Sequence, residues 1–312
     1  MSSSPSTAKA SPGPAPWRAP FLKNVNDMAS PEFNLATIHS SSPSSSGASS
    51  SSSLTPRLRT VIFRGLWASL PVNPKNTADL NPPLYESDLL TLTTDARMAK
   101  VPDFLTSNGE KDDIKKSGGG GPVEACFWTD AKVQWRIRGE AFLLGPDIDS
   151  SSSSSAGAKA LREHLLARMR TVTPADAKRR REQDIPSGKT VIGSSEQDWS
   201  FAREVTAHFG NLSPMMRGTF RNPVPGTSRA ANPPSDTLKL GQKVEDLDDE
   251  VARENFRVVV IVPTEVDQTD LSASEDPRRY LYRFVGAEAA GEEETEGGAE
   301  RVNGWEKIEL WP

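Results

Sequence analysis

Hydrophobic and polar residues alternate over short stretches of this chain, and the pattern predicts β-strands. The alternation is clearest over residues 133–144, where Trp135 and Ile137 fall on one parity and Gln134 and Arg136 on the other. Successive side chains of a strand point to opposite faces, so one face of this strand is apolar and the other is polar. We therefore expect a barrel strand whose polar face meets solvent or a ligand.

Several other stretches are rich in β-branched and aromatic residues, which is typical of strands. They cover residues 33–38, 57–67, 89–94, 123–129, 255–263, 279–285 and 305–311. Apolar residues at helical spacing predict helices at 161–169 and 199–209, and shorter helices are expected at 16–22 and 96–105. Strands dominate without regular alternation with helices. The predicted fold is therefore mostly β, an antiparallel barrel with helical insertions, and a Rossmann sheet is excluded.

Stretches of low complexity interrupt these elements. Residues 1–14 are rich in Ser, Pro and Ala and are expected to form a disordered N-terminus before a single domain over residues 15–312. Runs of Ser, Gly and charged residues bury little apolar surface, so long disordered loop insertions are expected within that domain. They lie at about residues 40–53, 108–121, 150–157, 227–250 and 286–300.

The composition limits the partners that the protein can have. A net charge of −5 argues against a general nucleic-acid binder. No apolar run reaches the roughly 18 residues that a membrane span needs, and no targeting segment is evident, so we expect a cytoplasmic protein. The one cysteine, Cys126, and the three scattered histidines share no ligand spacing, so no metal site is expected. No side chain stands out as a catalytic acid, base or nucleophile.

One candidate anion site lies just after a predicted strand. Arg97 and Lys100 stand at helical i, i+3 spacing, so both can converge on one phosphate, and the hydroxyls of Thr93 and Thr94 precede them. Arginine suits bidentate contact with a phosphate, whereas lysine supplies a point charge. This combination of residue types indicates a phosphate cradle.

Other basic and amide residues allow two interpretations each. Arg59 and Arg64 are five residues apart and face opposite sides of a regular strand, so only a twist, a bulge or a strand end lets both reach one anion. Gln134 carries both a donor and an acceptor, which suits the edge of a planar ring. Each of these residues can equally be a solvated polar group, and the basic run at 178–181 is typical of an exposed face.

Three stretches together resemble the motifs of a known family. They are Arg59-Thr-Val-Ile-Phe-Arg64-Gly65, Thr94-Asp-Ala-Arg97-Met-Ala-Lys100 and Gln134-Trp-Arg-Ile-Arg-Gly139, and the tail Trp305-Glu-Lys-Ile-Glu-Leu-Trp-Pro312 follows them. In order and spacing they are similar to a second branch of the pyridoxamine 5′-phosphate oxidase-like FMN-binding split barrels. The resemblance implies an FMN-binding split β-barrel of antiparallel strands that forms a homodimer with FMN sites between the subunits.

The resemblance also implies roles for matching positions. The FMN phosphate and ribityl chain would lie along Arg59, Thr60, Val61, Ile62, Phe63 and Arg64. The phosphate cradle would be completed by Thr93, Thr94 and Lys100, with Arg97 alongside. Gln134 would bond the isoalloxazine ring, and Arg283 would reach the flavin across the dimer interface.

The chain also departs from the family pattern. Met98 stands where Ser is usual, and the stretch with which the oxidase binds its substrate is not recognisable, although Arg162, Arg168 or the run at 178–181 can substitute for it. The first hypothesis is an FMN-dependent oxidoreductase, with a small phosphorylated substrate such as a B6 vitamer as one option. The alternative is a non-catalytic FMN-binding protein that has lost this substrate pocket. A third hypothesis is an interaction protein with disordered tails on a small β scaffold.

Overall fold

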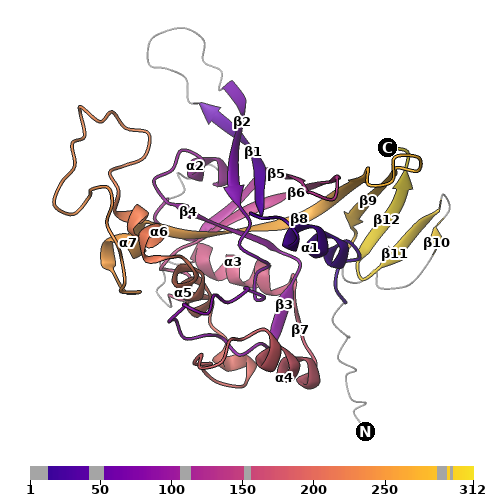
Figure 1. Cartoon of the computed structure of the whole chain (residues 1–312), viewed down its shortest axis with the longest axis horizontal. Coiled ribbons are helices and arrows are strands. Elements are labelled where there is room, and N and C mark those ends of the chain that lie inside the picture. The colour runs from indigo at the N-terminus through magenta and orange to yellow at the C-terminus, as the bar shows by residue number, and fades with distance from the viewer. Residues whose placement is uncertain (1–12, 42–52, 106–113, 151–155, 287–293, 296–297) are drawn as a thin grey trace.

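An antiparallel sheet forms the centre of the molecule. The computed structural model describes residues 13–41, 53–105, 114–150, 156–286, 294–295 and 298–312. The main sheet has the strand order β10-β11-β12-β9-β8-β6-β5-β1-β2, and β4 pairs with β8 off this path. Figure 1 shows the β1–β2 hairpin projecting at the top, β9 to β12 at one side, and α3, α4 and α5 below the sheet. The predicted mostly β, antiparallel architecture with helices is therefore confirmed.

The strands and helices have the following bounds. The main sheet contains β1 Glu32–Ser41, β2 Ser53–Ile62, β4 Leu90–Asp95, β5 Gly118–Trp128, β6 Val133–Leu144, β8 Phe256–Asp270, β9 Arg278–Phe284, β10 Glu294–Thr295, β11 Ala299–Val302 and β12 Trp305–Leu310. A second, small sheet pairs β3 Tyr85–Ser87 with β7 Met169–Thr171. The helices are α1 Arg18–Asn26, α2 Val101–Phe104, α3 Ala156–Leu166, α4 Pro174–Gln183, α5 Phe201–Asn211, α6 Pro214–Gly218 and α7 Glu250–Asn255.

Strand β8 is buried on both faces. Its alternate residues belong to two different hydrophobic clusters: Val259 and Ile261 pack with Trp17, Phe21 and Trp135. In the second cluster, Val258 and Val260 pack with Trp67, Phe201 and Phe209 below the sheet. Two buried faces favour apolar residues at successive positions, which is why residues 258–263 of this strand form an unbroken apolar run.

The chain that follows β2 bonds to β4. The backbone N–H of Arg64 donates to the carbonyl of Thr91 at 2.8 Å, and the Thr91 N–H donates to the carbonyl of Gly65 at 2.9 Å. Leu66 forms an isolated bridge with Leu90. These bonds place Arg64 beside β4, although the pairing of the named strands runs as an open path from β10 to β2. Closure as a split barrel stays a prediction.

Several elements differ in extent from the expectation. The expected strand 57–67 is instead β2, which begins at Ser53 and ends at Ile62, and the expected helix 96–105 is limited to α2. β5 begins at Gly118, so the glycine run 118–121 lies in a strand rather than in a loop. Strand β10 and the first two residues of β11 fall inside the stretch 286–300. The expected insertion 227–250 contains no helix or strand before α7 begins at Glu250. Residues 1–12, 42–52, 106–113, 151–155, 287–293 and 296–297 lie outside the described residues.

Glycines fit the start of β5 because the chain passes close to its neighbours there. A Cβ on Gly121 would lie 2.4 Å from the carbonyl oxygen of Asp103, and one on Gly119 would lie 2.5 Å from that of Ala141. The register between β5 and β6 also shifts between Gly119 and Gly121. A side chain is therefore excluded at these positions, and glycine is compatible with a bulged strand as well as with a loop.

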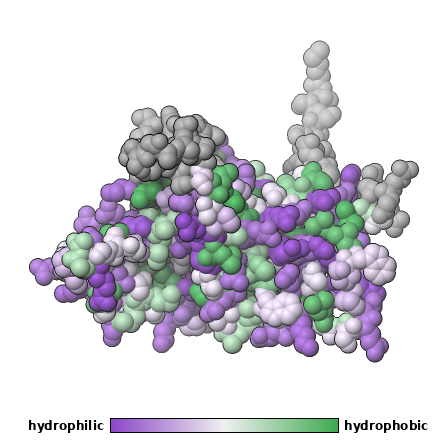
Figure 2. Space-filling model, turned by 90° about the horizontal axis from the view of Figure 1, so that it is seen from above, coloured by the Kyte–Doolittle hydropathy of each residue, from purple (hydrophilic) through white to green (hydrophobic). Residues whose placement is uncertain are grey.

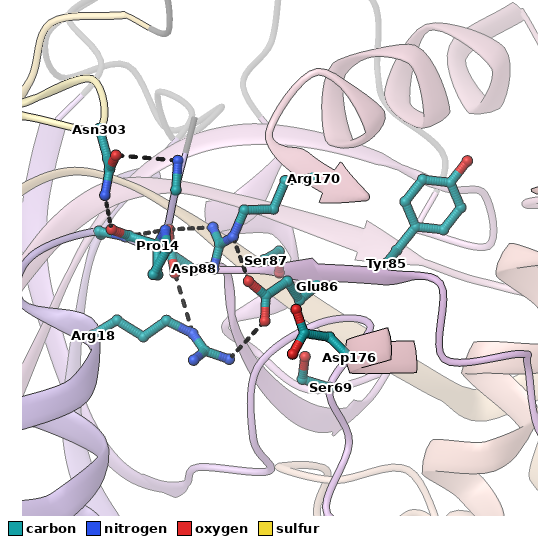
Figure 3. Close-up of polar contacts among 12 residues, drawn as sticks. Pro14, Arg18, Ser69, Tyr85, Glu86, Ser87, Asp88, Arg170, Asp176 and Asn303 are labelled. Atoms are coloured by element: carbon teal, nitrogen blue, oxygen red, sulfur yellow. Dashed lines mark hydrogen bonds and ion pairs between the residues drawn. The ribbon is translucent and has the colours of Figure 1, made fainter. Parts of the chain in front are cut away.

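An ion-pair network ties the N-terminal segment to the second sheet (Figure 3). Arg170 donates to Glu86 at 2.6 Å and to Asp88 at 2.7 and 3.0 Å, and Arg18 lies 3.3 Å from Asp88. Burial alone would raise the pKa of Glu86, but the positive charges of Arg170 and Arg18 outweigh it and lower the pKa. The backbone N–H of Ala15 also donates to Asp88. The network therefore fixes the entry of the chain against β3 and β7.

Candidate functional site

Four of the residues predicted for phosphate binding line one cavity of about 510 Å³: Arg64, Thr93, Thr94 and Lys100. Arg64 follows β2, the two threonines end β4, and Lys100 immediately precedes α2. The backbone bonds between the chain after β2 and β4 bring these segments together. Residues far apart in the sequence therefore line one cavity.

Two of the three cations that line this cavity, Arg64 and Lys100, lie on the β4 side without an acidic partner among the described residues, and Arg229 lies on the other wall. Within the described part of the chain, neither the Arg64 guanidinium nor the Lys100 ammonium forms a hydrogen bond or ion pair, and Arg64 Nε is buried without an acceptor. Burial lowers the pKa of Arg64. Burial also lowers the pKa of Lys100, the charge of Arg59 adds to the effect, and Asp95 opposes it. Two partly desolvated and unpaired positive charges favour an anionic ligand.

Hydroxyl groups lie on the β4 side of the cavity. Thr93 is half-buried, and Thr94 is buried with its hydroxyl donating to the carbonyl of Asp95 at 3.3 Å. Met98 lines the same cavity. A thioether stands at this position where a hydroxyl would add a donor, so the cations carry more of any anion contact.

Arg97 does not face an open anion site. Its guanidinium donates to both carboxylate oxygens of Asp95, at 2.9 and 2.6 Å. The same group also donates to the carbonyls of Phe220 at 3.2 Å and Asn222 at 3.1 Å. All of these acceptors belong to the protein itself. The structure therefore uses Arg97 to join β4 to the chain around Phe220.

Arg59 lies in a separate polar network on the β1 side. It donates to the Thr37 hydroxyl at 2.6 Å and to Asp103 at 3.4 Å, and Asp103 also bonds the hydroxyl of Thr37 and the ring of His39. Burial lowers the pKa of Arg59, while the ion pair with Asp103 opposes this shift. Its charge is therefore partly neutralised, although it acts on Lys100 through space.

The residues between the two arginines offer mainly backbone. Phe63 is buried in the core against Phe21 and Phe127. The hydroxyl of Thr60 donates to the Asn34 side chain at 3.1 Å. Val61 and Ile62 are half-buried at the end of β2.

Gln134 and Arg283 lie away from the cavity. Gln134 pairs with Thr269 at one end of β8, whereas Thr94 pairs with Arg257 at the other end, about 40 Å away along an extended strand. Arg283 is an exposed residue of β9 that pairs with Glu265 at 3.4 Å. Within one chain, these two residues and the four cavity residues do not surround a single ligand.

The opposite wall of the cavity comes from a segment to which the sequence analysis gave no site residue. Its apolar members are Leu212, Met216, Phe220, Pro223, Val224, Pro225 and Leu240. The prolines and the run at 223–226 are a sequence signal for a loop, but nothing in it indicates that the loop folds over β4. The nearby Arg217 is structural, because its Nε donates to the carbonyl of Val244 at 2.8 Å.

A larger cavity of about 960 Å³ lies between α1, α4 and the chain around Leu70. Its charged side chains are engaged with one another or with backbone: Arg18 pairs with Glu86, and Arg180 donates to the carbonyls of Tyr85 and Ala68. The smaller cavity differs from it in presenting the cations Arg64 and Lys100, which have no partner among the described residues. In the described residues no group of three or more His, Cys, Asp or Glu side chains could hold a metal ion, and no helix is long and apolar enough to cross a membrane.

Comparisons with known proteins place part of this chain in relation to a described family. Residues 14–145 match the family model described as pyridoxamine 5′-phosphate oxidase, FMN-binding domain. Arg64, Thr93, Thr94 and Lys100 all lie within this match, whereas the apolar wall lies beyond it. No protein of the curated set is similar to the chain.

Two solved structures share a distant likeness with the whole chain. A pyridoxamine 5′-phosphate oxidase-related, FMN binding protein from Nostoc punctiforme PCC 73102 is 18% identical, with a TM-score of 0.46 over 96% of this chain and 98% of that one. PhzG from Burkholderia lata 383, solved in complex with tetrahydrophenazine-1-carboxylic acid, is 12% identical, with a TM-score of 0.36 over 94% of this chain and 88% of that one. The likeness that bears on the site is therefore the match of residues 14–145 to the pyridoxamine 5′-phosphate oxidase FMN-binding domain family.

Proposed function

We propose that this protein binds FMN in the cavity lined by Arg64, Thr93, Thr94 and Lys100, and acts as an FMN-dependent oxidoreductase. The single observation that carries the proposal is the pair of unpaired, partly desolvated cations in a cavity of about 510 Å³ within the family-matched segment. A volume of this size is typical of small-molecule sites.

The residues present suit a phosphate ester joined to a planar group. Arg64 and Lys100 neutralise the phosphate, and the Thr93 hydroxyl adds a neutral donor. The apolar wall around Phe220 and Pro223 excludes water from the rest of the ligand. When bound, FMN itself supplies the hydride- and electron-transfer chemistry, while the protein binds and orients it. No side-chain acid or base is assigned.

We further propose that the sheet closes as a split barrel and that two chains form a homodimer. The bonds between the chain after β2 and β4 support closure. A second subunit would explain why Gln134 and Arg283 lie so far from the cavity of their own chain, since each could reach the flavin of the partner. Arg59 and the backbone of residues 60–63 would then lie along the ribityl chain.

An exposed apolar surface supports association. Ile38, Leu54 and Leu58 of the β1–β2 hairpin and Trp128 at the end of β5 are 44%, 69%, 68% and 54% exposed. Figure 2 looks down onto the hairpin end, where hydrophobic residues lie among hydrophilic ones instead of forming one unbroken patch. Exposed apolar side chains bordered by polar ones are typical of protein–protein interfaces.

The substrate proposed is a small phosphorylated compound such as a B6 vitamer. The alternative is a non-catalytic FMN-binding protein that has lost this substrate pocket, and the contacts of two arginines favour it. Two of the basic residues that can replace the oxidase's substrate-binding stretch are engaged elsewhere: Arg168 donates to the carbonyl of Pro263 at 2.7 Å, and Arg180 donates to backbone carbonyls.

A visible spectrum of the purified protein tests the cofactor. We expect flavin absorbance near roughly 450 nm, either as purified or after addition of FMN and gel filtration. Absence of bound flavin after reconstitution would remove the proposal. Bleaching by NAD(P)H, or peroxide formation with pyridoxamine 5′-phosphate, supports the oxidoreductase, whereas a stable yellow protein inert to both supports the non-catalytic alternative.

A further inference from the structure

The candidate cavity is built from two parts of the chain that must be held together. One wall, with Arg64, Thr93 and Lys100, belongs to the family-matched residues 14–145. The other wall lies within residues 212–240, beyond that match. The walls differ in chemistry. The first presents cations and hydroxyls, whereas the second is mainly apolar, although Thr219, Asn222, Thr227, Arg229 and Asn232 also belong to it.

Arg97 connects the two walls. Its side chain is 15% exposed and its partner Asp95 is 7% exposed, with an N–O separation of 2.6 Å. From this anchor on β4, Arg97 donates to the backbone carbonyls of Phe220 and Asn222, at 3.2 and 3.1 Å. These carbonyls flank Arg221, so the guanidinium fixes the direction in which the chain leaves Phe220 and enters the cavity wall.

Other bonds hold the same stretch from behind. The Asn255 side chain donates to the Phe220 carbonyl at 2.9 Å, and Arg221 pairs with Asp249 at 2.6 Å. The Phe220 ring packs against Phe209 and Phe256 in the lower cluster. The wall is therefore attached to the core independently, and Arg97 contributes the contact that joins it to β4, between Thr94 and Lys100.

The arrangement indicates the class of ligand. A cavity with unpaired cations on one side and Met216, Pro223, Val224 and Pro225 on the other suits an anion joined to a planar aromatic group. Proline and valine side chains offer a flat apolar surface without hydrogen-bonding groups. Such a surface favours an aromatic ring over a flexible polar chain.

We propose that Arg97 is a positioning residue, which holds the 216–225 wall over the anion site so that the wall selects a planar aromatic group on the ligand. This inference deepens the FMN assignment and depends on it only for the identity of the ligand. Arg97 contacts neither the phosphate nor the ring in this arrangement.

The test compares three probes on Arg97→Ala, Arg97→Lys and Arg64→Ala. The probes are FMN, riboflavin, which lacks the phosphate, and inorganic phosphate, which lacks the ring. Arg278→Ala is the control. This exposed arginine is the first residue of β9, and it pairs with Asp276, just before the strand, and with Glu309 of β12. Thermal unfolding of each variant confirms that it is folded.

For Arg97→Ala, we expect FMN and riboflavin to bind about tenfold more weakly, with phosphate binding within about twofold of wild type. The absorbance change of the flavin on binding should also weaken, because its ring has lost a surface. The flavin affinity of Arg97→Lys should lie between those of the wild type and Arg97→Ala, because an ammonium group can still bond Asp95 and one of the two carbonyls. Arg64→Ala should show the converse pattern, losing FMN and phosphate while retaining riboflavin.

Two results would overturn the inference. An equal loss of affinity for phosphate and for flavin in Arg97→Ala would mean that Arg97 contacts the anion directly. Unchanged flavin affinity would mean that the position of the wall does not depend on Arg97. Hydrogen exchange of the backbone amides at 219–225 tests separately whether Arg97 holds the wall. The exchange rate is expected to rise in Arg97→Ala but not in Arg278→Ala. If the wild-type protein bound neither flavin nor phosphate, the FMN function would fall, and the exchange result would still decide the role of Arg97.

Discussion

Arg64 and Lys100 differ from the nearby Arg59 and Arg97 in that no carboxylate among the described residues pairs with them. Arg59 bonds Asp103 and Arg97 bonds Asp95, so their charges are used within the protein. Spacing placed Arg97 and Lys100 near one phosphate, and the family resemblance added Arg59 and Arg64. Neither argument could distinguish a ligand contact from an internal ion pair. That distinction depends on which carboxylate the fold brings within reach, and Asp103 lies far from Arg59 in the sequence.

Removing either unpaired cation tests the site directly. We expect Arg64→Ala and Lys100→Ala each to weaken FMN binding by about 1.5–3 kcal/mol, the amount typical of a lost hydrogen bond to a charged group. Fluorescence titration of FMN measures the change, with Arg278→Ala as a control that leaves affinity unchanged. Wild-type affinity in both cavity variants would show that FMN binds elsewhere.

His208 provides a prediction about pH. Its ring is buried and stacks on Trp67 at 5.9 Å, and burial, with the charge of Arg64 adding to it, lowers the pKa of His208 to about 3. The unfolded state takes up a proton near pH 6.5 that the folded state does not, so stability should fall as the pH drops from 6.5 towards 3. The loss from this residue is about 2 kcal/mol between pH 7 and pH 5.

The variant His208→Phe keeps a stacking ring and removes the titration. Urea unfolding at pH 7 and pH 5 should show a smaller loss of stability in the variant than in wild type. Burial raises the pKa of Glu204, so this residue makes the folded state more stable as the pH falls. Its contribution is the same in both proteins and cancels in the comparison. Equal losses in the two proteins would mean that His208 is protonated in the folded state.

At the scale of elements, the sequence predicted strands better than their ends. The alternation over β6 and the apolar run of β8 are confirmed because each reflects burial along the whole element. The glycine run at 118–121 was assigned to a loop, because close approach to α2 and β6 cannot be seen in the sequence. The short β3–β7 sheet was missed, since three-residue strands carry too little pattern.

Gly139 shows what such close approach demands of a strand. A Cβ at this position in β6 would lie 2.1 Å from the carbonyl oxygen of Val262, whereas one on Gly118 would meet nothing within 4 Å. We expect Gly139→Ala to reduce the free energy of unfolding by about 1–3 kcal/mol through overpacking, and Gly118→Ala to change it by less than about 1 kcal/mol. Urea denaturation of both variants measures the difference, and similar stabilities would refute the steric argument.

At the scale of the whole molecule, the site divides between what one chain assembles and what a second chain would add. The sequence predicted one composite site, and the structure brings only four of its members into the cavity. Gln134 and Arg283 were placed there by family resemblance. Neither residue spacing nor periodicity can show whether two residues meet within a chain or across an interface.

Association of two chains can be tested on the exposed hairpin. Leu58 is 68% exposed and makes no contribution to the core clusters, so Leu58→Glu should leave the melting temperature nearly unchanged. Analytical ultracentrifugation should show a dimer for the wild type and a monomer for the variant, because a charge buried at an interface is costly. Exposed Leu271, at 40%, offers a control as Leu271→Glu. A monomeric wild-type protein would exclude the proposed dimer.

The burial of β8 on both faces has a consequence for the synthesis of this protein. β4 pairs with β8, and β6 pairs with it along its whole length, yet β8 leaves the ribosome more than 100 residues after both strands. Until β8 is synthesised, β6 has an unpaired edge and the two hydrophobic clusters on either side of the sheet lack the residues that β8 supplies. Such late, long-range pairing slows folding. A fragment ending at residue 145, where the family match ends, would lack β8 and expose an unpaired edge of β6, which favours aggregation.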